Sequence, residues 1–272
     1  GSIVRDTGYS YQSDGYIGND LTLLAKHLVR GRNVVSAAYA QEPDSLLYFV
    51  TDDGLMLCLT YVADQKVYAW SHFVTDGKYK AVCAANHGNN DRIYAVVERR
   101  INGKSVRYLE YFAPLVESDA EQDYTMMDAA VRAEYPTPQK ELPAGDVLPG
   151  KDVVVMADGY FFEGVRMAAD ARIPEAAKNI IVGLPYTMTL EQPNWDAGNT
   201  DTGTVQGRKK VVTNAILRLT KSYGGRVGQN AHNMDKIIYD AEAMETDNNV
   251  LYTGDKKITL PAGGYDTDGR TC

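Results

Sequence analysis

Metal coordination would need side chains that this chain has only in small number. Its four histidines are His27, His72, His87 and His232. No two of them have the HxH or HxxxH spacing that brings two imidazoles to one metal ion. The three cysteines are Cys58, Cys83 and Cys272, an odd number at no metal-ligand spacing. We therefore predict no metal site and no disulfide bond, with the first two thiols acting as small apolar side chains.

Two short segments contain residue types that ion-binding loops use. Residues 266–269 read DTDG, which resembles the start of a calcium loop but lacks its third acidic position and distal glutamate. Residues 224–228 read GGRVG, which is similar to a phosphate-binding loop, but no apolar helix follows to supply the anion site. We interpret the first segment as a tight turn and the second as a hairpin turn, and we expect no bound cofactor.

Catalysis would need a nucleophile or an acid and base pair in a suitable setting. The sequence contains no GxSxG nucleophile elbow, so a hydrolase triad has no starting point. The carboxylate pairs Glu117/Asp119 and Glu242/Glu245 have the residue types that glycoside hydrolysis uses. Their surroundings favour a solvated surface instead. We therefore expect a protein without catalytic activity.

Composition favours a protein that works through its contact surface. The chain has 272 residues, with 28 Lys and Arg against 36 Asp and Glu, a net charge of −8. Tight binding to nucleic acid normally needs the opposite sign. Tyrosine outnumbers phenylalanine 19 to 5, a bias typical of half-buried strands and interfaces. No apolar run approaches the ~20 residues that span a bilayer, so no membrane-spanning segment is predicted.

The elements that would position these side chains are mostly strands. One short helix is predicted over residues 21–30, from Asp20 as its cap, leucines at helical spacing and Gly31 at its end. Beyond it, apolar stretches alternate with turn pairs such as Asp53-Gly54 and Asp76-Gly77. The pattern predicts strands at 34–40, 46–51, 55–61, 67–72, 80–85, 93–98 and 105–111. Such a series indicates antiparallel meander sheets like those of propeller blades.

A proline-rich stretch then divides the chain. Its prolines are Pro114, Pro136, Pro138, Pro143 and Pro149. We predict that residues 1–113 form the helix and meander, residues 114–150 a crossover or linker, and residues 151–272 a second β domain with long loops. The strands predicted in that domain are 152–157, 160–165, 179–191 and 210–220, and the loop 194–208 is expected to be mobile. The opening Gly1-Ser2 resembles a cloning scar, and we expect the chain to be part of a longer protein.

Motifs in a fixed order run through most of the chain. Residues 4–28 read VRDTGYSYQSDGYIGNDLTLLAKHL and residues 46–77 read LLYFVTDDGLMLCLTYVADQKVYAWSHFVTDG. The later motifs are INGKSVRYLEYF, LPGKDVVVMADG, IIVGLPY, RKKVVTNAILRL and YTGDKKITLP. Together they resemble the tail nozzle or tail tubular proteins of short-tailed bacteriophages and related prophage tail proteins. The loop 194–208 and residues 229–249 match nothing in that family.

The resemblance implies a structural virion protein with no catalytic residues to transfer. Copies would form a ring around the channel through which DNA leaves the capsid, and they would contact neighbouring tail or adaptor proteins. The protein would lie in the virion tail after assembly in the host cytoplasm. The net negative charge agrees with DNA that passes without tight binding.

Two other functions compete with this one. A receptor-binding or glycan-binding β module would stack an exposed aromatic ring on a sugar, and Trp195 in the loop is the candidate residue. Trp70 alternates with polar residues in a predicted strand, so we assign it to the core. A peptidoglycan-cleaving tail enzyme would instead need an acidic pair in a cleft.

Overall fold

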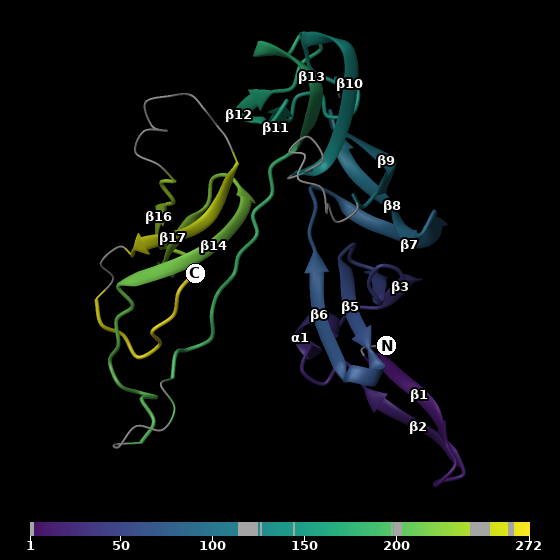
Figure 1. Cartoon of the computed structure of the whole chain (residues 1–272). Coiled ribbons are helices and arrows are strands. Elements are labelled where there is room, and N and C mark those ends of the chain that lie inside the picture. Colours follow the sequence, from purple (N-terminus) through teal and green to yellow (C-terminus); the bar gives the residue numbers. More distant parts are fainter. Residues whose placement is uncertain are drawn as a thin grey trace. The chain divides into compact units, whose positions relative to one another are not determined.

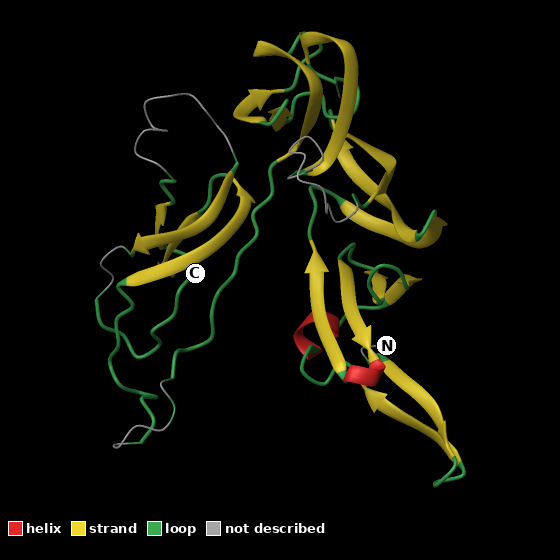
Figure 2. Ribbon diagram, viewed as in Figure 1, coloured by secondary structure: helices red, strands yellow, loops and turns green. Residues whose placement is uncertain are grey.

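The computed structural model describes residues 3–113, 125, 127–143, 145–196, 198, 203–239, 251–260 and 264–272. Most of these residues lie in antiparallel strands, as Figures 1 and 2 show, so the predicted mainly-β class is confirmed. The chain forms two compact units. Unit 1 consists of Gly1–Glu117 with Asp146–Gly150, and unit 2 consists of Ser118–Gly145 with Lys151–Cys272.

A four-stranded meander is the first sheet of unit 1. Its strands, in sheet order, are β3 (Val34–Ala40), β4 (Leu46–Thr51), β5 (Met56–Val62) and β6 (Val67–Phe73). A single 3-10 turn, η1 (Ala63–Gln65), lies between the last two strands. The β4–β5 turn is the predicted Asp53-Gly54 pair, where Gly54 has φ of 93° and the Thr51 hydroxyl donates to Asp53. Turn chemistry therefore sets these boundaries as expected.

A second sheet of three strands packs on the first. Its strands are β7 (Lys78–His87), β8 (Asn90–Ile101) and β9 (Lys104–Tyr111). The predicted turn at Asp76-Gly77 is not a hairpin, because β6 and β7 do not pair and the chain there crosses from one sheet to the other. The Arg99 guanidinium holds the Asp76 carbonyl at 2.8 Å in this crossing. The predicted meander is thus two packed sheets.

Both faces of the β4–β5 pair are buried. Tyr48, Val50 and Met56 pack against the three-stranded sheet in one apolar cluster. Phe49 and Leu57 lie in a second cluster on the opposite face. There the Trp70 ring stacks on Phe49 with centroids 5.7 Å apart, which agrees with the core role assigned to Trp70. Continuous apolar runs in β4 and β5 follow from burial on both faces.

The N-terminal segment differs from its prediction. The helix α1 covers only Lys26–Val29 instead of residues 21–30. The Asp20 carboxylate accepts hydrogen bonds from the Thr22 amide and hydroxyl, which forms a turn before the helix. Leu24 is 93% exposed, so the leucine spacing does not define one buried helix face. Before this turn lies a hairpin that was not predicted, β1 (Arg5–Ser10) with β2 (Gly15–Asp20).

Unit 2 contains a four-stranded sheet whose first strand falls in the expected linker. The strands, in sheet order, are β10 (Asp128–Glu141), β13 (Arg172–Leu184), β11 (Asp152–Ala157) and β12 (Tyr160–Arg166). The prediction that prolines interrupt strand structure across residues 114–150 is therefore wrong for β10. Pro136 and Pro138 are tolerated because β10 is an edge strand whose pairing with β13 shifts between Glu134 and Gln139. The core of the sheet comes from β11 and the end of β13.

Two strand pairs complete unit 2. They are β14 (Asn214–Ser222) with β17 (Tyr252–Thr259), and β15 (Arg226–Asn230) with β16 (Asn233–Lys236). The strand predicted at 179–191 ends at Leu184, and the chain continues as the long stretch after β13 in Figure 1. The Cys272 amide and carbonyl both bond to Gly228, at 2.9 Å each, which ties the last residue to β15.

Candidate interaction surfaces

The outer face of the β7–β9 sheet has two rows of apolar side chains. Cross-strand pairing aligns Cys83, Tyr94 and Tyr111 in one row and Ala81, Val96 and Leu109 in the next. Leu109 is 73% exposed although it lies in the middle of β9. The Arg92 guanidinium lies 4.9 Å from the Tyr111 ring centroid, a cation–π distance. We call these six apolar residues the outer apolar face.

A positively charged group borders the outer apolar face. The Glu98 carboxylate pairs with Arg107 at 3.1 Å and with Lys80 at 3.5 Å, so one anion serves two cations. The hydrogen bond from Arg107 holds the pKa of Glu98 below its ordinary value, and Lys80 acts in the same direction. Lys104 at the start of β9 is exposed as well. This end of the sheet therefore has an excess of positive charge.

The β1–β2 hairpin exposes tyrosine rings. Tyr9 and Tyr16 face each other across the pair, with centroids 5.9 Å apart in an edge-to-face arrangement. The Tyr9 hydroxyl donates to Asp14 at 2.7 Å, and this bond raises the pKa of Tyr9. Tyr11 in the hairpin loop is almost fully exposed. The hairpin base is held to unit 1, because Tyr61 of β5 bonds to Asp6 and this bond raises the pKa of Tyr61, so the exposed rings lie toward the hairpin tip.

Trp195 lies between β13 and β14, and hydrogen bonds join it and the next residue to described residues nearer β14. Its indole is a little over half exposed, and its carbonyl accepts a bond from the Lys210 ammonium at 2.8 Å. The next residue, Asp196, accepts from the Thr204 hydroxyl at 2.7 Å and from the Val205 amide at 3.2 Å. The bond from Thr204, followed by these backbone bonds, lowers the pKa of Asp196. The sequence prediction for Trp195 as an exposed ring is met, but no second aromatic ring contacts it in the described residues.

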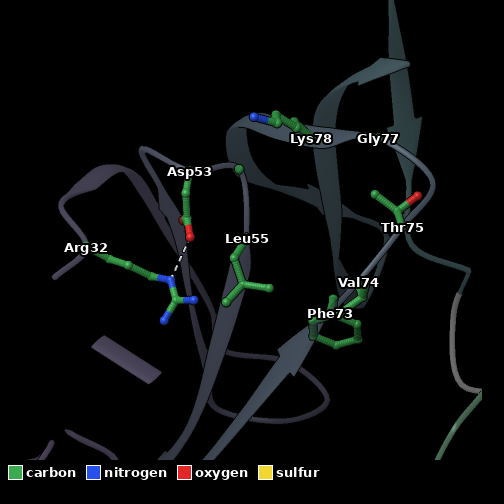
Figure 3. A pocket seen from close by; sticks show the side chains of 9 residues that line it. Arg32, Asp53, Leu55, Phe73, Val74, Thr75, Gly77 and Lys78 are labelled. Atoms are coloured by element: carbon green, nitrogen blue, oxygen red, sulfur yellow. Dashed lines mark hydrogen bonds and ion pairs between the residues drawn. The ribbon is translucent and has the colours of Figure 1, made fainter. Parts of the chain in front are cut away.

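A small pocket lies near the crossing between the two sheets of unit 1 (Figure 3). Its volume is about 220 Å³, below the range of about 300–1,000 Å³ that ligand pockets usually occupy. Arg32 and Asp53 form an ion pair of 2.8 Å on one side, and Phe73 with Val74 lines the other. Bonds from the Thr51 hydroxyl and then Arg32 lower the pKa of Asp53. Both groups of this ion pair are thus used within the fold.

The segments considered for ion binding have structural roles. In residues 266–269, the Asp266 carboxylate accepts bonds from the amides of Asp268 and Gly269, which confirms a tight turn. Residues 224–228 do not form one hairpin turn as predicted: Gly224 and Gly225 form the connection before β15, and the rest belongs to the strand. No group of three potential metal ligands occurs in the described residues.

The remaining predictions concern the cysteines, two carboxylate pairs and membrane-spanning segments. Cys58, Cys83 and Cys272 are all free thiols. The pairs Glu117/Asp119 and Glu242/Glu245 lie outside the described residues. No helix in the described ranges is long and apolar enough to cross a membrane.

Sequence reasoning did not find the outer apolar face, because its rows depend on the register between three strands. It placed residues 185–191 in the strand predicted over 179–191, which ends at Leu184. No family model and no curated protein matches this chain.

Proposed function

We propose that this protein is a structural component of a phage tail, a subunit of a nozzle or tube ring around the DNA exit channel, without catalytic activity. The observation that carries the proposal is the outer apolar face, where Leu109 and Tyr111 are exposed on one side of the β7–β9 sheet. Contiguous exposed apolar surface is typical of protein–protein contact sites. Aromatic residues and arginine are also enriched in such sites, and Arg92 lies over Tyr111 here.

The proposed partners are copies of the same chain and neighbouring tail or adaptor proteins. A ring needs two different patches on each subunit, since each copy contacts one neighbour through each patch. The outer apolar face and the β1–β2 hairpin lie on different strands of unit 1, so the chain exposes more than one patch for copies of itself and for neighbouring tail proteins. A net charge of −8 supports a channel wall that does not retain a passing polyanion.

The location of this sequence in the virion tests the proposal. We expect antibody raised against this chain, or density assigned to it in intact virions, to lie on the tail axis around the DNA channel. Density in a peripheral receptor-binding fibre would contradict the proposal. Labelled virions from a phage that lacks this protein provide the control for antibody specificity.

A glycan-binding module is the second candidate, because the Trp195 ring is a little over half exposed and the next residue, Asp196, bonds to Thr204 and Val205. An exposed indole ring has the flat apolar surface that stacks on a sugar. The nozzle proposal predicts that Trp195→Ala leaves binding to host-surface polysaccharide unchanged in a pull-down or calorimetric measurement. The control is Tyr11→Ala, which removes an exposed ring from the hairpin. Saturable binding by the unaltered chain that only Trp195→Ala abolishes would favour the glycan module.

A further inference from the structure

The stretch that follows β13 has the side-chain pattern of a strand but no sheet. Tyr186, Met188 and Leu190 alternate with threonines and are 58%, 83% and 77% exposed. Within the described residues, no backbone hydrogen bond involves residues 185–191. Both backbone edges and the apolar side of this stretch are therefore available, as a strand awaiting a partner would be. We call residues 185–191 the donor segment.

The chain also contains an open sheet edge with a matching side. β9 is the last strand of its sheet and pairs only with β8 among the described strands. Leu109 and Tyr111 point to the outer face, while Tyr108 points inward and its hydroxyl donates to the Val147 carbonyl. A strand added beside β9 would extend the outer apolar face by its own alternate residues.

Charge complementarity selects this edge and its direction. Residues 185–196 contain Glu191 and Asp196 but no lysine or arginine. The start of β9 has Lys104 and Arg107, and Arg107 shares the Glu98 carboxylate with Lys80. An antiparallel arrangement that sets Met188 opposite Leu109 also sets Tyr186 near Tyr111 and brings the acidic end of the donor segment to the basic start of β9. A parallel arrangement would separate these charges.

We infer that the donor segment of one copy adds as an antiparallel strand to the β9 edge of the next copy. Main-chain hydrogen bonds along the edge give the contact its affinity, and the alternate apolar side chains set its register. Glu191 now pairs with Arg270 at 2.6 Å, and Arg270 also pairs with Asp268, so Glu191 can move to a second cation while Arg270 keeps a partner.

This contact would be head-to-tail, because the donor belongs to unit 2 and the acceptor edge to unit 1. Each copy gives its segment to one neighbour and receives one from another, which is the heterologous contact that closes rings. The inference deepens the proposed function, and it rests on that function for the conclusion that the assembly is a tail ring. The pairing itself can be measured without virions.

Engineered cysteines test the pairing in the full 272-residue chain. The background carries Cys83→Ser and Cys272→Ser, which leaves only the buried Cys58. Met188→Cys is then combined with Leu109→Cys, and mild oxidation is followed on a non-reducing gel. We expect a ladder of dimers, trimers and larger species. The matched control combines Met188→Cys with Ala69→Cys, which is exposed on β6, another edge strand.

The rates of ladder formation decide the outcome. We expect the Met188/Leu109 pair to cross-link at least about tenfold faster than the control, since specific pairing raises the effective thiol concentration. Equal rates, no ladder, or a disulfide closed within one chain would overturn the inference. Hydrogen exchange on the unaltered chain adds a readout without cysteines: the β9 amides should gain protection as concentration rises.

Failure of this inference differs from failure of the proposed function. Absence of the ladder together with axial density in virions would reject strand addition and keep the ring. A ladder together with peripheral density would keep strand addition and reject the nozzle.

Discussion

Replacing Glu110 by alanine is expected to lower the free energy of unfolding by about 3 kcal/mol, the lower end of the range for breaking a buried ion pair. The Arg99 side chain is 1% exposed, and its Nε and Nη2 donate to the two Glu110 carboxylate oxygens at 2.8 and 2.7 Å. Removing the carboxylate leaves a buried guanidinium without this bidentate acceptor. The lower end applies because Glu110 is partly exposed and water can reach the site.

The structure supplies a control with the same geometry and different burial. Arg218 pairs with Asp255 through two bonds of 2.8 and 2.9 Å, but its side chain is 84% exposed. Asp255→Ala should therefore change stability only slightly, because solvent screens an exposed pair. Urea unfolding followed by tyrosine fluorescence measures both variants. Equal effects of Glu110→Ala and Asp255→Ala would show that burial does not strengthen the Arg99 pair.

The Arg99 pair also shows why part of the fold could not be predicted from the sequence. Turn pairs such as Asn102-Gly103 fix local strand boundaries, because positive φ at both residues suits a two-residue hairpin. Nothing local states that the chain at Asp76 leaves one sheet for another. At that crossing the guanidinium of Arg99, which is distant in the sequence, donates to the Asp76 carbonyl. Local chemistry was sufficient for the strands from β3 to β9, and tertiary contacts decided how these strands are divided between sheets.

Two further differences between the predicted and the observed elements have similar causes. Prolines predict a strand break unless the strand has an open edge, and whether Pro136 lies at an edge depends on sheet order. The leucine spacing over residues 21–30 predicts a helix, but the Asp20 turn takes up its first residues and leaves Leu24 in solvent. Both sequence patterns are present as described. The proline pattern is overridden by sheet order, which depends on strands distant in the chain, and the leucine pattern is overridden by the local Asp20 turn.

The candidate surfaces also differ in how much of each can be read from the sequence. Apolar residues alternate at Tyr186, Met188 and Leu190, beyond Leu184, where the strand predicted over residues 179–191 ends. This alternation is visible in the sequence. It does not identify the strand that pairs with it. The outer apolar face depends on the registers that place Tyr94 beside Tyr111 and Val96 beside Leu109. Register is a property of the folded sheet, so residue spacing alone could not reveal this face.

Gly228→Ala is expected to destabilise the β15–β16 hairpin by about 2–3 kcal/mol, as overpacking of a closed site does. A Cβ atom at this position would lie 1.8 Å from the Asn233 carbonyl oxygen, which belongs to the backbone of the partner strand. Gly228 also exchanges two backbone bonds of 2.9 Å with Cys272. The main chain has to shift to admit the methyl group, and both pairings are weakened together.

The control is Gly145→Ala in the same unit, where an added Cβ meets only ordinary contacts of 3.8 Å or more. Hydrogen exchange should show faster exchange at the β15, β16 and Cys272 amides in Gly228→Ala and unchanged rates there in Gly145→Ala. Unchanged protection in both variants would mean that the hairpin tolerates the methyl group. Faster exchange in Gly228→Ala alone would explain the GGRVG segment without a phosphate. Its last glycine would be required because two backbones approach it closely.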